Sequence, residues 1–449
     1  LPWVSKKMYG THTQVATSDA DSPRTSDTAK KNPLYYWGLL ASVVVGALLS
    51  FGSLANNATD KLGELDLTAS NKDDTSANLG DPLSNGQQTP EGEWSAYGGT
   101  NYGQRYSPLT QINTDNVKDL EVAWQIQTGD MKGPDDTGET TYEATPLKIG
   151  NALYLCTPHN WVMALDADSG ETLWKFDPKI SGNLQRQHQT CRGVSYYAGQ
   201  AGTASTPPAA IAQTNDDSAN VAVANKATTA SNVIAQKVDG NTFESASKQC
   251  DAKIFIPTSD AKLYALDPNT GQRCQNFAED GSLDLLHNMP FKQDGYYYST
   301  SPPIVVGNTI VVAGAVNDNY DVNSPSGVIR AYDVNTGELL WNWDSGDPEN
   351  TAPFDINDPT QTYKTSSPNS WSTASADEKL GLVYFPMGNR VPDQLGSYRN
   401  AAEEKYATSV VALDIKTGEA RWVQQFVHHD LWDMDTPAQP TLLDLNTAD

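Results

Sequence analysis

A short pattern, A-[LY]-D-x-x-[ST]-G-x-x-x-W, recurs along the chain and constrains the fold more than any other feature. It is complete at residues 164–174, 331–341 and 412–422. A fourth copy begins at Ala265 and has Gln275 in place of the tryptophan. In each copy a strand ends at the aspartate, whose carboxylate can accept turn N–H groups, and the glycine supplies a positive φ before the next strand. We therefore predict a hairpin at each copy.

A further short apolar stretch precedes the hairpins, as residues 152–155 precede residues 161–165. Four short strands in a unit of roughly 40 residues or more are typical of a β-propeller, in which each blade buries its faces against its neighbours. The repeated tryptophan is then expected to pack between blades. About four or five such units fit between Glu93 and Asp449, whereas a propeller must close on itself. We expect an all-β fold and a chain that is part of a longer protein.

The N-terminal region contains one uncharged stretch, residues 34–55, LYYWGLLASVVVGALLSFGSLA. A run of this length suffices to cross the hydrocarbon core of a membrane. Lys30 and Lys31 precede it and acidic residues follow, so the positive-inside rule places residues 1–33 in the cytoplasm and the rest outside. Residues 56–92 have the composition of a linker, and residues 93–449 hold the propeller units. The sequence thus predicts a transmembrane helix that anchors an exported domain in membrane lipid.

A cleaved signal peptide is the alternative for the same stretch, because Ser53-Leu54-Ala55 resembles a small-x-small cleavage site. Both interpretations export the remainder of the chain. In an oxidising compartment two disulfides can form, but four cysteines allow three connectivities and no CxxC spacing chooses among them. The cysteines are Cys156, Cys191, Cys250 and Cys274.

Composition excludes some partners. The net charge of −25 argues against a basic patch for nucleic acid or for an anionic membrane surface. Residues 199–249 are rich in Ala, Thr, Ser, Asn and Gln and cannot bury much surface, so we expect an inserted surface loop there.

Several longer motifs point to a family. WSAYGG, QRYSPL and AW, within residues 94–124, resemble the N-terminal signature of the quinoprotein dehydrogenases, eight-bladed propellers that hold pyrroloquinoline quinone (PQQ). The repeat is similar to that family's tryptophan-docking motif. QHQTCRGVSYY, SSPNSW, PMGN and VHHDLWDMDTPAQP resemble its membrane-bound branch, which contains glucose, quinate and shikimate dehydrogenases. The resemblance covers residues 94–443. The adjacent cysteine pair of many family members is missing here.

Residues 427–435, VHHDLWDMD, crowd two histidines and three carboxylates together. Zinc is disfavoured, because adjacent residues on a strand point to opposite faces and cannot converge on one ion. Local capping of a blade is a second interpretation. The resemblance implies a third, in which Asp433 is the catalytic base that takes the proton from an alcohol. His428, His429 and Asp430 then serve as supports.

The resemblance also implies a PQQ site. Trp371 in SSPNSW matches the tryptophan that stacks on the cofactor, Arg192 in CRG matches the arginine that pairs with its carboxylates, and His188 in QHQT matches a histidine near substrate and cofactor. Glu143 matches a cofactor-contacting acid. The structural alternatives are a tryptophan packed between blades and satisfied loop residues.

A cation site follows from the same resemblance, since Asp318, Asn319 and Asn389 fall at the family's cation-ligand positions. Oxygen donors of this kind suit Ca²⁺ or Mg²⁺. Without the resemblance both stretches are Asn-rich turns. A family lysine that contacts the quinone lies downstream of HHDLWD, and we expect it beyond Asp449.

The resemblance implies an enzyme of the bacterial inner membrane with its propeller facing the periplasm. It is expected to oxidise glucose or another aldose to the lactone: Asp433 takes the hydroxyl proton, hydride moves to PQQ, and electrons pass to ubiquinone. Quinate and shikimate, which are cyclic polyols, are the alternative substrates. A cofactor-free propeller acting as a scaffold in the cell envelope is the alternative of another class. The joint presence of SSPNSW, CRG and HHDLWD favours the enzyme.

Overall fold

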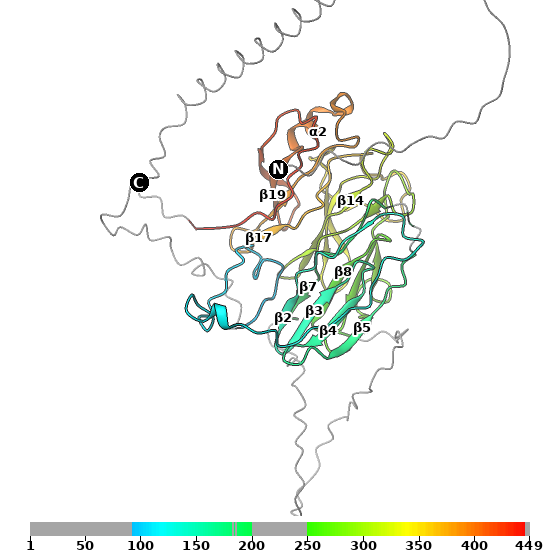
Figure 1. Ribbon diagram of the computed structural model, residues 1–449. Helices are drawn as coiled ribbons and strands as arrows, with labels where there is room; N and C mark the ends of the chain where they lie inside the picture. The colour runs from blue at the N-terminus through cyan, green and yellow to red at the C-terminus, as the bar shows by residue number, and fades with distance from the viewer. Residues whose placement is uncertain (1–91, 182–183, 185, 200–248, 445–449) are drawn as a thin grey trace, which may run out of the picture. The chain divides into compact units, whose positions relative to one another are not determined.

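The computed structural model describes residues 92–181, 184, 186–199 and 249–444 (Figure 1). All of them belong to one compact unit, Ala77–Asp449. The predicted cytoplasmic segment and transmembrane helix, nearly all of the linker, and most of the predicted inserted loop lie outside the described residues. Within the described ranges, the structure has no helix that is both long and apolar enough to span a membrane.

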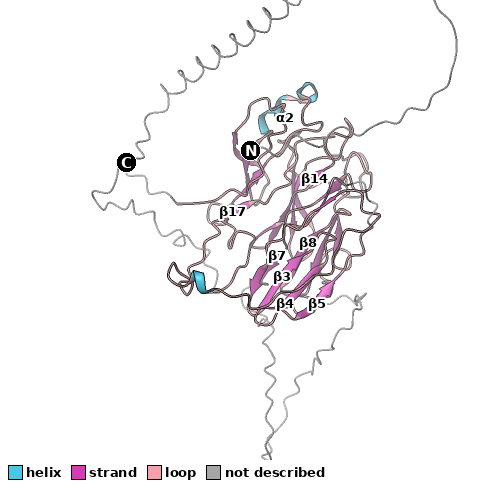
Figure 2. Cartoon of the chain, viewed as in Figure 1, coloured by secondary structure: helices cyan, strands magenta, loops and turns pink. Residues whose placement is uncertain are grey.

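Strands are the main regular secondary structure of the described chain (Figure 2), and most of them form four antiparallel sheets of four strands each. Sheet 1 consists of β2 (Leu147–Ile149), β3 (Ala152–Cys156), β4 (Val162–Asp166) and β5 (Thr172–Phe176). Sheet 2 consists of β7 (Ser195–Tyr197), β8 (Lys253–Pro257), β9 (Lys262–Leu266) and β10 (Ser282–Asp284). Sheet 3 consists of β12 (Ile304–Val306), β13 (Thr309–Val312), β15 (Ile329–Asp333) and β16 (Leu339–Trp343). Sheet 4 consists of β17 (Ser375–Asp377), β18 (Leu382–Pro386), β19 (Ser409–Asp414) and β20 (Ala420–Gln425).

The remaining elements are short. A parallel pair joins β1 (Glu139–Thr140) to β6 (His188–Gln189), and an antiparallel pair joins β11 (Tyr297–Tyr298) to β14 (Ala315–Val316). The helical elements are η1 (Val117–Asp119), η2 (Gly396–Tyr398) and α2 (Ala401–Tyr406). The helix α2 begins with a capping box between Asn400 and Glu403.

Consecutive sheets pack face to face, because the strand residues alternate between two cores. In β8, Ile254 and Ile256 belong to the core shared with sheet 1, whereas Phe255 belongs to the core shared with sheet 3. In β13, Val311 likewise faces sheet 4. The first strand of sheet 3, β12, contacts the first strands of sheets 2 and 4. Stacked four-stranded meanders of this kind confirm the all-β propeller fold expected from the repeat.

The three complete copies of the repeat form the predicted hairpins. In the first, Asp166 Oδ1 accepts hydrogen bonds from the backbone N–H of Ser169 and from its hydroxyl, at 2.8 and 2.9 Å. Gly170 follows with a φ of 73°, and a register shift interrupts the pairing of β4 with β5 between Ala164 and Leu165. In the second and third copies, Asp333 and Asp414 likewise accept a hydrogen bond from the N–H of the threonine, and the strand pairing shifts at the corresponding place.

The repeated tryptophan docks one sheet onto the glycine of the next. Trp341 in sheet 3 donates its indole N–H to the carbonyl of Ile415 in sheet 4 at 2.7 Å. Its ring lies so close to Gly418 that a Cβ there would sit 2.5 Å from a ring carbon. Trp124 and Trp174 dock in the same way onto the first and second sheets, respectively. The prediction that this tryptophan packs between blades is therefore confirmed for Trp174 and Trp341.

The fourth copy departs from the prediction. Its outer strand, β10, begins only at Ser282, and Cys274 turns into the core instead, where it is bonded to Cys250. Ala278 takes the place of the missing tryptophan and donates its N–H to Thr336 in the next sheet at 2.9 Å. The turn predicted at Gly271 still forms, since Cys274 donates its N–H to the carbonyl of Ala265 at 2.9 Å and Leu266 bridges Arg273. No regular outer strand follows it directly, and a disulfide and a small residue make the contact that the aromatic makes elsewhere.

The disulfides select one of the three connectivities left open by the sequence. Cys156 pairs with Cys191, and Cys250 pairs with Cys274.

Candidate active site

The loops that precede the first strands of sheets 2, 3 and 4 meet at one place. Arg192 lies shortly before β7, Thr300 shortly before β12 and Trp371 shortly before β17. Because β12 contacts both β7 and β17, these three loops are brought together. The segment after β20, which contains VHHDLWDMD, reaches the same place through Asp435.

Trp371 is the centre of this group. Its indole N–H donates to Asp435 Oδ2 at 2.8 Å, and its backbone carbonyl accepts from the hydroxyls of Thr300 and Ser301 at 3.2 and 2.7 Å. The guanidinium of Arg192 lies 5.1 Å from the centre of the indole ring. The tryptophan is thus fixed at its edge and its backbone, with a cation over its face.

Arg192 is held by its side chain and by its backbone. One guanidinium nitrogen lies 2.9 Å from Glu143 Oε2, and the other donates to the hydroxyl of Thr300 at 2.5 Å. Glu143 accepts a second bond from the hydroxyl of Thr141 at 2.9 Å. The structure therefore brings three of the predicted cofactor residues together, namely Trp371, Arg192 and Glu143.

His188 lies beside this group rather than within it. Its Nδ1 is 3.6 Å from Glu139 Oε2 across the β1–β6 pair, and its side chain is 54% exposed. The preceding residue, Gln187, connects the strand to the predicted cation ligands: its Nε2 donates to Asp318 Oδ1 at 2.5 Å, and its Oε1 accepts from the Asp318 N–H at 3.1 Å.

A cluster of carboxylates lies next to Trp371 and is formed by Asp318, Asp393, Asp433 and Asp435. Burial and the negative charges of the other three raise the pKa of Asp393 to about 9, although Arg399 acts in the opposite direction. Burial raises the pKa of Asp435 to about 6; the bond from Trp371 opposes this shift and Asp433 adds to it. The cluster holds more negative charge than the protein compensates.

The carboxylate of Asp433 differs from the neighbouring carboxylates because it accepts no hydrogen bond from the described residues. Burial, followed by the charges of Asp318 and Asp430, raises the pKa of its carboxyl group. Its backbone is left-handed, with a φ of 59°. Among the described residues, none donates a hydrogen bond to this carboxylate, which lies half-buried at the edge of the cluster. A carboxylate in this state is available to accept a proton from a ligand.

Asp430 is the support of the loop. Its fully buried carboxylate accepts from Thr408 Oγ1 at 2.7 Å, and from the N–H groups of Trp432 and Met434 at 2.9 Å each. Burial alone would raise its pKa, but these bonds hold the pKa below the ordinary value. The two histidines are exposed, and His429 pairs with Glu404 at 3.1 Å.

The predicted cation ligands supply oxygen atoms around the same cluster. Asn389 is 1% exposed; its Nδ2 donates to Asp430 at 2.9 Å, while its buried Oδ1 has no hydrogen-bond partner among the described residues. Asn319 directs its Nδ2 toward Asp318 and Asp393, at 3.3 and 3.4 Å. In the described part of the chain, no three His, Cys, Asp or Glu side chains form a metal site by themselves. A cation here would need amide oxygens as well as carboxylates.

Sequence reasoning missed Asp393 and did not foresee the contact of Asp435 with Trp371. Asp393 lies in the loop after PMGN, and its residue type is no different from that of many exposed loop acids. Only its burial, at 3% exposure, distinguishes it. Asp435 belongs to the crowded motif itself, so the density of acids in that motif was the available signal.

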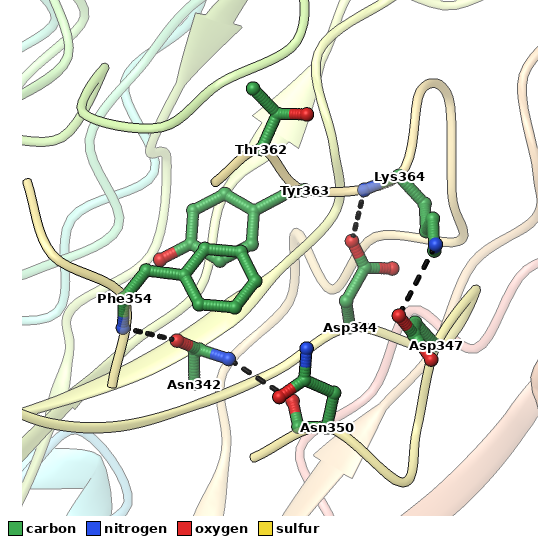
Figure 3. Close-up of a pocket in the computed structure, with 8 residues that line it drawn as sticks. All are labelled: Asn342, Asp344, Asp347, Asn350, Phe354, Thr362, Tyr363 and Lys364. Atoms are coloured by element: carbon green, nitrogen blue, oxygen red, sulfur yellow. Dashed lines mark hydrogen bonds and ion pairs between the residues drawn. The ribbon is translucent and has the colours of Figure 1, made fainter. Parts of the chain in front are cut away.

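A small cavity elsewhere is structural. It lies among residues of the loop after β16, where Phe354 stacks on Tyr363 with ring centres 4.8 Å apart (Figure 3). Its volume is about 10 Å³, which admits at most one water molecule. The buried Asp344 there is satisfied by the N–H groups of Gly346 and Lys364.

The loops of this all-β propeller thus place a fixed tryptophan and an arginine beside a group of acids, an arrangement that suits a flat, anionic ligand. The chain belongs to the family described as glucose/ethanol/alcohol dehydrogenase, β-propeller domain, with PQQ as its cofactor, whose model matches residues 94–449.

Similar proteins agree with this assignment. The chain is 43% identical over 410 residues to the quinoprotein glucose dehydrogenase of Escherichia coli (strain K12), covering 91% of this chain and 45% of the relative. It is 37% identical over 451 residues to that of Gluconobacter oxydans (strain 621H), covering 100% and 47%. It is 38% identical over 357 residues to the quinate/shikimate dehydrogenase (quinone) of Acinetobacter baylyi, covering 79% and 40%. The chain thus spans about half the length of the curated relatives it matches.

The solved structures show the same fold. The quinohemoprotein alcohol dehydrogenase from Comamonas testosteroni matches with a TM-score of 0.52 and 22% identity, over 77% of this chain and 43% of that one. A europium-containing methanol dehydrogenase matches with a TM-score of 0.51 and 22% identity, over 78% and 51%.

Proposed function

We propose that the full-length protein oxidises glucose or another aldose at its anomeric hydroxyl to the lactone. The observation that carries the proposal is the unbonded carboxylate of Asp433 beside the Trp371–Asp435 pair, because oxidation of an alcohol needs a free base next to a bound electron acceptor. Two relatives named quinoprotein glucose dehydrogenase are 43% identical and a third is 37% identical, whereas the relative named for quinate and shikimate is 38% identical.

The residues present fit PQQ. Trp371 offers a flat ring that is held at its edge. The guanidinium of Arg192 lies over that ring, and its positive charge can pair with the cofactor's carboxylates. Arg192 is bonded to Glu143 in this structure and can exchange that carboxylate for one of the cofactor's. When bound, PQQ supplies the acceptor for two electrons. The side chain of His188 is 54% exposed beside this group, and we propose that it contacts the sugar.

The residues also fit a Ca²⁺ or Mg²⁺ ion. The unpartnered Oδ1 of Asn389, together with Asp318 and Asn319, offers hard oxygen donors to a cation. Burial and then carboxylate repulsion raise the pKa of Asp393; a cation at this position would offset the repulsion and would favour the ionised form of Asp433.

Asp433 is proposed to take the hydroxyl proton of the sugar. The oxidation removes two electrons and two protons from the substrate, and the carboxylate accepts the first proton while the electrons leave with hydride. Asp430 holds the loop in place through bonds from the N–H groups of Trp432 and Met434, on either side of Asp433.

We propose that the complete propeller has eight blades. Two apolar surfaces of the described chain favour further blades. Trp422, the docking residue of sheet 4, is 46% exposed, and the stretch from Tyr106 to Val122 exposes several large apolar side chains.

The proposed location is the bacterial inner membrane, with residues 34–55 as the anchor, the propeller in the periplasm and ubiquinone as the electron acceptor. Cysteine-accessibility labelling in intact cells should find position 31 protected and position 94 labelled. A mature protein that starts near residue 56 would instead favour a cleaved signal peptide.

The function is tested by dye-linked oxidation with the full-length protein. We expect activity on glucose after reconstitution with PQQ and Ca²⁺ or Mg²⁺, and loss of activity after treatment with a chelator. Parallel assays with other aldoses, quinate and shikimate decide the substrate. Faster turnover of quinate than of glucose would replace the proposal with the second candidate, which the Acinetobacter baylyi relative favours.

A further inference from the structure

The Cys156–Cys191 disulfide joins two parts of the fold that meet beside the candidate site. Cys156 is the last residue of β3 in sheet 1, whereas Cys191 lies between β6 and β7, where the chain enters sheet 2. Both side chains are buried, at 0% and 4% exposure. The crosslink therefore fixes the start of sheet 2 against the end of a central strand in sheet 1.

Arg192 is the next residue along the chain, and its backbone is hydrogen-bonded on both sides. Its N–H donates to the carbonyl of Thr300 at 2.9 Å, and its carbonyl accepts from the N–H of Thr145 at 2.8 Å. The long arginine side chain is aimed from this anchor at Trp371. The disulfide holds the residue directly before this anchor, so a shift of Cys191 would displace the backbone of Arg192 relative to the indole.

The second disulfide has a different setting. Cys250 and Cys274 are both in the part of the chain that forms sheet 2, and both side chains belong to the core between sheets 2 and 3. The N–H of Cys250 is bonded to Asn276, and its carbonyl accepts from Lys253. The two crosslinks span 35 and 24 residues, so the loop-closure model gives them similar effects on stability.

We propose that the Cys156–Cys191 disulfide is a positioning crosslink for Arg192, and through Arg192 for the anionic cofactor, whereas Cys250–Cys274 stabilises the fold alone. This inference rests on the proposed function, since it takes PQQ as the ligand of Arg192.

The test compares two double variants of the full-length protein, Cys156→Ala/Cys191→Ala and the matched control Cys250→Ala/Cys274→Ala. PQQ affinity is measured by quenching of tryptophan fluorescence in excess Ca²⁺, and Tm is measured in parallel. We expect similar falls in Tm. We expect the Kd for PQQ to rise by about tenfold in the first variant, the effect of one lost charge-assisted hydrogen bond, and by less than about twofold in the control.

A double-mutant cycle with Arg192→Gln identifies the route of the effect. In the Arg192→Gln background, removal of Cys156–Cys191 should change the Kd by less than about twofold, because the residue that the crosslink positions is already gone. A full tenfold loss in that background, or equal losses in the two disulfide variants, would overturn the inference. Wild-type protein that does not bind PQQ would overturn the proposed function as well.

If the first variant does not fold, the same comparison is made in Cys250→Ala/Cys274→Ala, where one disulfide remains. Dithiothreitol reduces this disulfide to two thiols and is itself oxidised to a cyclic disulfide. Alkylation and mass spectrometry give the fraction reduced. PQQ affinity should fall in proportion to that fraction, and an affinity independent of it would contradict the inference.

Discussion

Three acids in one nine-residue stretch have three different environments, and the difference decides what each can do. Asp430 is fully buried and bonded to backbone N–H groups, so its carboxylate is ionised and committed to the loop. Asp435 is bonded to the indole of Trp371. Asp433 faces the acid cluster without a hydrogen bond from any described residue. All three are aspartates of one short stretch, and only their partners separate a support, an orienting group and a candidate base.

Replacing Asp433 by Asn in the full-length protein preserves the shape of the side chain but removes the base. Turnover should fall by about 10²–10⁴-fold, the usual contribution of a general base, while the Kd for PQQ changes little. Asp435→Asn is the control two residues away and should keep turnover far closer to wild type. Near-normal turnover of Asp433→Asn with PQQ bound would remove this residue from the role.

Asp435 is expected to orient Trp371 through its oxygen atom and not through its charge. Asp435→Asn keeps an acceptor for the indole N–H, whereas Asp435→Leu leaves that buried donor without one. PQQ affinity should therefore fall by about tenfold in the Leu variant, the effect of one unsatisfied hydrogen bond, and much less in the Asn variant. Fluorescence titration measures both. Equal losses in the two variants would assign the effect to charge.

At the scale of elements, the hairpin turn and the docking contact depend on the same glycine. The aspartate caps the turn, the glycine takes the positive φ, and the missing side chain of that glycine leaves room for the tryptophan of the preceding sheet. The copy with Gln275 shows that the contact can be replaced: Ala278 approaches Gly337 through its backbone and Cβ. The sheets stay stacked, but the hairpin loses its regular outer strand.

Gly418→Ala tests the docking contact, with Gly381→Ala as its control. Both glycines have a left-handed φ, 72° and 68°, so both variants pay about 1–2 kcal/mol of backbone strain. Only at Gly418 does the new Cβ meet the Trp341 ring, whereas nothing lies within 4 Å at Gly381. Overpacking should cost the Gly418 variant about 1–3 kcal/mol more. Urea unfolding measures both losses, and equal losses would contradict the docking contact.

At the scale of the whole molecule, one histidine ties the segment before β1 to sheet 1. His159, in the turn between β3 and β4, pairs through Nδ1 with Asp130, and its Nε2 lies 3.1 Å from both oxygens of Asp136. The segment they anchor leads into β1, which pairs with the strand of His188. The bond to Asp130 raises the pKa of His159, although burial opposes the shift.

This arrangement predicts a dependence of stability on pH. Because the folded-state pKa of His159 is raised, its stabilisation is complete below the unfolded value of about 6.5 and is lost as pH rises through the folded-state pKa. His159→Gln should therefore lower the free energy of unfolding by about 1.5–3 kcal/mol near pH 6 and by less near pH 9. Urea unfolding at both values checks this. A loss that grows with pH would contradict a charged His159.

The sequence by itself determined the features that depend on local pattern. The Asp, Gly and Trp of each complete repeat are close in sequence, so the hairpin, the all-β class and the tryptophan between sheets were predictable from spacing. Trp371, Arg192 and Glu143 were indicated by the resemblance of their motifs to a known family and not by local pattern, and the structure brings them together.

The contacts between separate sheets and loops were decided only by the tertiary structure. The pairing of Cys156 with Cys191, the burial of Asp393 and the bond between Trp371 and Asp435 join residues far apart in the chain. The site around Trp371 depends in addition on the loops that the stacked first strands β7, β12 and β17 bring to one place. Local propensity carries no information about such contacts, because their free energy comes from burial and charge that exist only after the sheets have packed.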